Sequence, residues 1–182
     1  LRAGRRVERG YRPTPLPEAT PALKVGGPVL ITGGFGGIGL TLARELVRQA
    51  RAPIALVSRT PLPGRESWEG ILRRQGGPLA ARIRAVRSLE ALGGRVLTLA
   101  ADVANLEEMR AAVEEAQAAF GPLSGVIHAA GVVEDAPILG KSPLSVEDVF
   151  APKVHGTQVL DALFPDGALD WMLLCSSTST AT

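Results

Sequence analysis

Residues 31–40 read ITGGFGGIGL, a glycine-rich stretch between two apolar flanks. It follows PVLIT (28–32), a short apolar run typical of a strand buried on both faces of a parallel sheet. It precedes residues 38–50, where apolar side chains recur at helical spacing. A glycine-rich turn between a buried strand and a helix is where a doubly wound α/β sheet binds a pyrophosphate. The stretch therefore predicts a nucleotide-binding loop that comprises Thr32, Gly33, Gly34, Phe35, Gly36, Gly37, Ile38 and Gly39.

Strands and helices alternate along the rest of the chain. Continuous apolar runs predict buried strands, and amphipathic runs with capping residues predict the helices between them. Asn105 and Ser145 are the expected N-caps of two helices, and Pro152 is expected to kink or restart the second. The predicted strands are 28–32, 53–59, 95–103, 123–131 and 169–177, and the predicted helices are 38–50, 65–93 with a break at 76–78, 105–120 and 145–164.

This alternation predicts the fold class and the domain organisation. It is typical of an α/β protein with a doubly wound parallel sheet, the Rossmann fold, and a strand order of 3-2-1-4-5. The domain covers residues 28–182 and is expected to be incomplete at its C-terminus. Residues 1–27, which include RPTPLPEATP (12–21), lack periodicity and are interpreted as a linker or the tail of a preceding domain. Because residue 1 is Leu, we expect a fragment of a larger polypeptide.

Composition argues against several function classes. The chain has 20 basic and 18 acidic residues and only 4% aromatic residues, which argues against a nucleic-acid-binding surface. The longest apolar runs are too short to cross a membrane. The single cysteine, Cys175, and two separated histidines show no metal-site spacing. A lone cysteine also fits a reducing compartment, so we expect a cytoplasmic protein.

The end of the second predicted strand indicates which nucleotide the loop would bind. An NAD enzyme usually carries an acidic residue there for the ribose 2′-hydroxyl, whereas this chain has Ser58 and Arg59. A guanidinium suits a 2′-phosphate, so NADP(H) is favoured. The alternative is that Arg59 is an ordinary exposed cation.

The loop fits two glycine spacings at once. Thr32, Gly33, Gly37 and Gly39 meet T-G-x-x-x-G-x-G, and the same set with Gly36 in place of Gly37 meets T-G-x-x-G-x-x-G. The first spacing resembles the reductases of the short-chain dehydrogenase/reductase family. The second resembles its extended members, which include sugar-nucleotide epimerases, so the loop alone does not choose between them.

Two further motifs extend the resemblance over nearly the whole chain. VIHAAGV (126–132) and FAPKVHGTQVL (150–160) accompany TGGFGGIG, SRT and ADV, and together they resemble the ketoreductase domain of modular polyketide synthases. The N-terminal LRAGRRVERGYRPTPLP resembles the last strand and exit linker of the structural subdomain that precedes the catalytic half. The resemblance implies that Asp102 and Val103 contact the adenine, although Asp102 could also be an ordinary turn residue. It also implies that one strand end supports the cofactor from below, with the residues His128, Ala129, Ala130 and Gly131.

The same resemblance implies a reaction. In that family a hydride passes from NADPH to the 3-keto carbon of an acyl chain on an acyl carrier protein, within a synthase that has neighbouring domains. Lys153 and Ser177 match the catalytic lysine and serine. The serine hydrogen-bonds the ketone oxygen, and the lysine lowers the pKa of a tyrosine that donates the proton. That tyrosine is expected beyond Thr182, so the chain alone is expected to be inactive.

Two other interpretations remain open. The first is a noncatalytic structural half-domain of a synthase, against which the complete glycine loop argues. The second is another NADP-dependent enzyme of the same fold, such as a sugar-nucleotide epimerase, against which Arg59 and the position of Lys153 before the fifth strand argue.

The sequence indicates less about three other positions. Val133, Glu134 and Asp135 stand where many domains that give the D-configured alcohol carry LDD, and the retained Asp135 favours that configuration. His128 is expected to be packed or hydrogen-bonded rather than catalytic. Trp68 lies in the long crossover between the second and third strands and receives no assignment.

Overall fold

The structure is a computed structural model that describes residues 4, 6, 12–15, 25–74 and 76–177. Most of the predicted linker, 1–27, lies outside these residues. Three short helical turns, η1 (Arg65–Ser67), η2 (Ile138–Gly140) and the π-helical η3 (Ala151–His155), supplement the longer elements. The longer elements are β1 (Val29–Thr32), α1 (Gly37–Ala50), β2 (Ile54–Ser58), α2 (Trp68–Arg73), α3 (Pro78–Ala91), β3 (Val96–Ala100), α4 (Leu106–Phe120), β4 (Gly125–His128), α5 (Pro143–Phe150), α6 (Gly156–Leu163) and β5 (Trp171–Leu174).

The strands form one parallel sheet in the order β3-β2-β1-β4-β5. This confirms the predicted Rossmann topology and strand order. At the end of β1, Thr32 is in register with Val57 of β2 on one side and with His128 of β4 on the other. The glycine loop therefore leaves the sheet at the point where the strand order reverses, which is where ligands bind in such folds.

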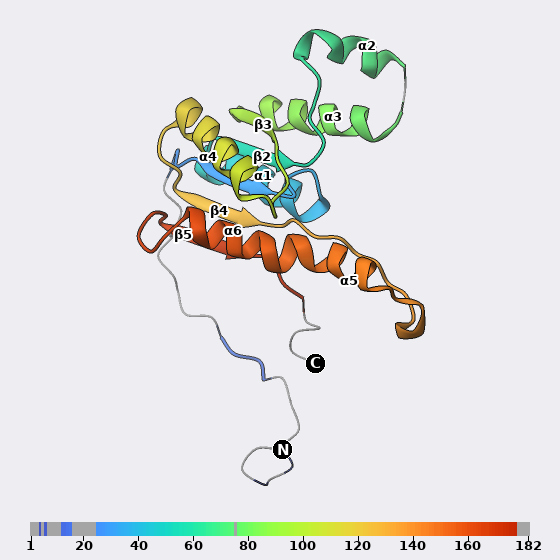
Figure 1. Cartoon of the computed structure of the whole chain (residues 1–182). Helices are drawn as coiled ribbons and strands as arrows, with labels where there is room; N and C mark the ends of the chain where they lie inside the picture. The colour runs from blue at the N-terminus through green and yellow to red at the C-terminus, as the bar shows by residue number, and fades with distance from the viewer. Residues whose placement is uncertain (1–3, 5, 7–11, 16–24, 75, 178–182) are drawn as a thin grey trace.

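Each face of the sheet is covered by its own set of helices. Val29 and Ile31 of β1 face a core formed with α1, α3 and Trp68. Leu30, between them, faces a second core formed with α4 and α6. All four residues of β1 are buried, which explains why the first three, Val29, Leu30 and Ile31, are all apolar rather than alternating with polar residues. In Figure 1, α2 and α5 lie at the periphery, farther from the sheet than the other helices.

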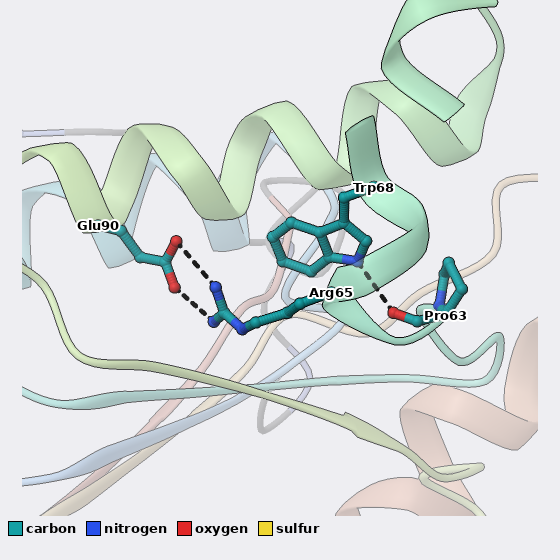
Figure 2. A network of polar contacts seen from close by, with 4 residues as sticks. All are labelled: Pro63, Arg65, Trp68 and Glu90. Atoms are coloured by element: carbon teal, nitrogen blue, oxygen red, sulfur yellow. Dashed lines mark hydrogen bonds and ion pairs between the residues drawn. The ribbon is translucent and has the colours of Figure 1, made fainter. Parts of the chain in front are cut away.

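The long crossover between β2 and β3 is docked through Trp68, which is 4% exposed and belongs to the first core. Its indole N–H donates a hydrogen bond to the Pro63 carbonyl at 2.9 Å, as Figure 2 shows. The Arg65 guanidinium lies 4.7 Å from the centre of the indole ring and pairs with Glu90 of α3. The predicted break in the helical segment is confirmed, because Gly76 and Gly77 have positive φ between α2 and α3.

The predicted helix caps have different outcomes. Asn105 is confirmed as the N-cap of α4, where its Oδ1 accepts hydrogen bonds from the Glu107 and Glu108 amides. The prediction for Ser145 was wrong, because Ser142 is the N-cap of α5 and Pro143 occupies its first position. Proline suits this position because the first-turn N–H has no partner in a helix. Ser145 completes a capping box, in which its Oγ accepts a hydrogen bond from the Ser142 amide.

Pro152 interrupts the helix as predicted, and the interruption is a π-helical turn. The turn η3 joins α5 to α6, and in Figure 1 the three form one continuous rod beside the sheet. The described helices do not include one with the length and apolar character needed to span a bilayer.

Candidate functional site

A pocket of about 470 Å³ lies at the carboxyl ends of the central strands. It is the crevice that the sheet topology predicts, next to the loop after β1. Of the residues predicted to bind the cofactor, it is lined by Thr32, Gly33, Ser58, Arg59, Asp102, Val103, Ala130 and Gly131. The other predicted residues do not line it, and these are Gly34, Phe35, Gly36, Gly37, Ile38, Gly39, His128, Ala129, Lys153 and Ser177.

The glycines of the loop serve different purposes. Gly33 has a φ of +64°, and a Cβ there would lie 2.6 Å from the Ala129 carbonyl oxygen. A Cβ on Gly39 would lie 2.8 Å from the Gly33 carbonyl oxygen. The fold itself therefore requires glycine at these two positions. Gly37 is exposed, and a Cβ on it would meet no atom within 4 Å, so the protein's own packing does not explain that glycine.

The N-terminus of α1 is open to a ligand. Its N-cap, Gly36, has no side chain to accept a hydrogen bond, and the first turn contains no acidic residue. The first N–H groups of a helix have no partner within the helix and carry a partial positive charge. Together with the open space at Gly37, this arrangement suits a phosphate group.

Ser58 and Arg59 lie where β2 ends, at the edge of the pocket. The Ser58 Oγ donates a hydrogen bond to the Thr60 carbonyl at 3.1 Å and accepts one from the Arg82 guanidinium. Arg59 is exposed and forms no ion pair with the residues of ranges 25–74 and 76–177. Its charge is therefore available to a phosphorylated ligand in the pocket.

Asp102 and Val103 lie at the neighbouring strand end, after β3. The Asp102 carboxylate accepts a hydrogen bond from the Ala104 amide at 2.9 Å, so this residue shapes the turn as well as lining the pocket. Val103 is buried against α6, and a Cβ on Gly156 would approach its side chain to 2.9 Å. Glycine at this position of α6 allows the helix to lie close to the pocket wall.

His128 is buried beneath the pocket, at 4% exposure, and is hydrogen-bonded on both ring nitrogens. Its Nε2 lies 2.8 Å from the Pro152 carbonyl, which only accepts, so Nε2 carries the proton. Its Nδ1 then accepts from the Thr32 hydroxyl at 2.7 Å when the ring is neutral. Burial lowers the pKa of His128, against the smaller opposing effect of the Pro152 carbonyl. The imidazole thus joins β1, β4 and η3, in line with the expectation that it is hydrogen-bonded.

Lys153 lies on η3 beside the pocket. Its Cε is 3.7 Å from the position that a Cβ on Gly131 would occupy, so the side chain runs along the end of the HAAG motif. Ser177 is exposed and follows β5, after Cys175, whose amide donates to the His128 carbonyl. Lys153 thus lies beside Gly131, which follows β4, and Ser177 follows β5, the strand next to β4 in the sheet.

Other pocket residues were not anticipated from the sequence. Glu134 and Asp148 bring carboxylates to the pocket, from the segment after β4 and from α5. Apolar and backbone surface comes from Val57, Ala101, Val132, Ala151 and Pro152. Glu134 could have been found from the sequence, because it stands three residues after the HAAG motif. Asp148 could not, because it resembles any other exposed acidic residue of a helix. Asp135 is exposed and does not line the pocket.

Comparison with known proteins identifies the family of this chain. The family model described as the KR domain matches residues 27–182. The chain belongs to the KR domain family. The match includes every described strand of this KR domain and all of the residues that line its pocket.

The relatives of this KR domain include large synthases. The 6-methylsalicylic acid synthase of Aspergillus terreus is 40% identical over 164 residues, which are 90% of this chain and 9% of that synthase. The polyketide synthase PksM of Bacillus subtilis is 33% identical over 157 residues, which are 86% of this chain and 3% of that synthase. The chain thus spans less than a tenth of the length of these two relatives.

Solved structures agree with the family. An N-terminal ketoreductase from the macrolactin assembly line has a TM-score of 0.73 and 34% identity, with 86% of this chain and 29% of that chain covered. An A1-type ketoreductase has a TM-score of 0.72 and 32% identity, with 91% of this chain and 32% of that chain covered. A blue fluorescent protein from a metagenomic library, solved in complex with NADPH, has a TM-score of 0.59 and 25% identity. The match covers 76% of this chain and 49% of that chain.

Proposed function

We propose that this KR domain acts within a polyketide synthase of the cytoplasm as an NADPH-dependent ketoreductase. It would reduce a β-ketoacyl chain on an acyl carrier protein to the β-hydroxyacyl form. Residues 28–182 would form the cofactor-binding part, preceded by a linker in 1–27. The observation that carries the proposal is the pocket at the carboxyl ends of β1 to β4, which joins Gly33, Arg59 and Gly131, with Lys153 beside it.

The residues present fit NADPH on grounds that are independent of the family. The open space at Gly37 and the uncapped start of α1 suit the pyrophosphate. Arg59 offers a guanidinium without a carboxylate partner in the described ranges, which suits the 2′-phosphate that distinguishes NADPH from NADH. Asp102 and Val103 line the pocket after the end of β3, where the adenine would lie.

When bound, NADPH supplies the hydride that reduces the ketone carbon. The protein's own residues bind and orient the cofactor and the ketone, and they control the transfer of the proton. The Ser177 hydroxyl would donate a hydrogen bond to the ketone oxygen, where negative charge develops. The Lys153 ammonium would lie beside Gly131 and stabilise a proton donor, lowering the pKa of the tyrosine that the family supplies. The role of Ser177 is inferred from its position after β5, and that of Lys153 from its position on η3.

The direct test uses the longest polypeptide that the reading frame encodes. NADPH binding is measured by fluorescence titration, and turnover is measured with a β-ketoacyl thioester. Arg59→Ala is expected to weaken NADPH at least about tenfold, the loss expected for one charge-assisted contact. Lys153→Ala and Ser177→Ala are expected to abolish turnover while NADPH still binds. Failure of the wild-type protein to bind NADPH would refute the proposal and favour a structural half-domain.

A further inference from the structure

Arg82 of α3 reaches from the middle of the long crossover to the end of β2. Its Nη2 donates hydrogen bonds to the Ser58 Oγ and, at 2.6 Å, to the Thr60 carbonyl. Its guanidinium carbon lies 4.2 Å from the centre of the Phe35 ring in the glycine loop. One side chain thus joins the two segments of chain, the loop after β1 and the end of β2, between which the cofactor pocket opens.

Arg82 differs from two nearby arginines, Arg65 and Arg87, in that no carboxylate of the described residues neutralises its charge. Arg65 pairs with Glu90, and Arg87 of the same helix pairs with Glu69, whereas Arg82 forms no ion pair with the described residues. Its Nε is buried without a hydrogen-bond partner in the described part of the chain. Burial also lowers the pKa of this guanidinium, so its charged form is held there at a cost. A partly buried cation without a carboxylate creates a positive potential that favours an anion nearby.

We propose that Arg82 is a positioning residue of the cofactor site that gives this domain its preference for a 2′-phosphorylated nicotinamide dinucleotide. The inference rests on the proposed function. Arg82 holds Ser58 in place at the pocket edge, next to Arg59, and adds a second positive charge behind these two residues. The phosphate itself would be contacted by Ser58 and Arg59.

The hydrogen bonds explain why an arginine is needed at this position. The Thr60 carbonyl receives two donors, the Ser58 hydroxyl at 3.1 Å and the Arg82 Nη2 at 2.6 Å. When the Ser58 hydroxyl turns its proton toward a phosphate oxygen, Arg82 keeps the Thr60 carbonyl satisfied. The Ser58 Oγ meanwhile continues to accept from Arg82 and stays where it is. A lysine could keep the charge but could not match the rigid, planar arrangement of donors.

The test compares dissociation constants for NADPH and NADH in the longest polypeptide that the reading frame encodes. Arg82→Met is expected to weaken NADPH about tenfold, as for the loss of one charge-assisted contact, and to change NADH less than about twofold. Arg84→Met is the matched control, because it removes the same charge from an exposed position two residues along α3. It is expected to leave both constants unchanged.

Two results would overturn the inference. Equal weakening of NADPH and NADH by Arg82→Met would mean that Arg82 only supports the fold, and unchanged binding of both would mean that it has no part in the site. Should Arg82→Met fail to fold, Arg82→Lys provides the same comparison, with NADPH weakened a few-fold and NADH unchanged. A wild-type protein that binds neither nucleotide would instead refute the proposed function.

Discussion

Gly37→Ala tests whether the glycine at this position is required for NADPH binding rather than for the stability of the fold. Because a Cβ at this position would meet no atom within 4 Å, we expect the free energy of unfolding to change by less than about 1 kcal/mol. Alanine's higher helix propensity acts in favour of the variant, since Gly37 is the first residue of α1. Urea denaturation followed by circular dichroism measures this quantity.

Binding of NADPH should respond quite differently. The added methyl group would take up part of the open space at the first residue of α1, where the pyrophosphate is proposed to lie. Displacing the pyrophosphate would cost about one charge-assisted hydrogen bond, which contributes about 1.5–3 kcal/mol. We therefore expect a dissociation constant about 10- to 100-fold higher, measured by fluorescence titration.

Gly33→Ala is the matched control within the same loop. Its φ of +64° is costly for alanine, and its Cβ would lie 2.6 Å from the Ala129 carbonyl oxygen and 2.7 Å from the Ala130 Cα. We expect a loss of about 2–4 kcal/mol in the free energy of unfolding. A folded Gly37→Ala protein with wild-type NADPH affinity would refute the proposed position of the pyrophosphate. Destabilisation equal to that of Gly33→Ala would refute the described loop geometry.

Three other substitutions test the fold around the site by urea denaturation. Trp68→Ala should lower the free energy of unfolding by about 3–5 kcal/mol, because the indole is buried in the first core, and a loss below about 1 kcal/mol would contradict its docking role. Asn105→Ala should cost about 1 kcal/mol through loss of the α4 cap, and no loss would contradict the two amide contacts. The lowered pKa of His128 means that the unfolded state binds the proton more readily. Its contribution to stability is therefore complete above pH about 6.5 and falls on acidification, by up to about 1.4 kcal/mol per pH unit. His128→Gln should remove this slope, whereas His155→Gln, at an exposed position, should retain it.

Features that depend on local sequence were predictable. Three consecutive apolar residues and a threonine make up the buried β1, and this pattern, followed by the glycine loop, marks the central strand of a doubly wound sheet. The strand order follows because right-handed crossovers leave few ways to arrange alternating strands and helices. The cap of α5 was also within reach, since serine followed by proline at 142–143 is a stronger start signal than Ser145.

Features that depend on contacts between distant elements were not predictable. The crossover contains Arg82, Arg84 and Arg87 within one short helical segment, and composition cannot tell them apart. Only the packing of α3 on the sheet directs Arg82 to Ser58 and Arg87 to Glu69 of α2. The assignment of Trp68 was missing for the same reason, because its partners come from α3 and from the loop before α2.

The π-helical turn η3 connects the fold to the proposed chemistry. A proline within an α-helix deprives the carbonyl four residues earlier of its donor and crowds it, and a wider turn relieves that crowding. In η3 the Pro152 carbonyl is hydrogen-bonded by the buried imidazole of His128. This bond ties the turn to the end of β4, three residues before Gly131, against which the Lys153 side chain lies. The proline that breaks the helix and the histidine that ends the strand therefore act together to fix where Lys153 leaves the backbone. The lysine is thus placed beside the pocket by a hydrogen-bond network around the buried His128, and it forms no ion pair within ranges 25–74 and 76–177.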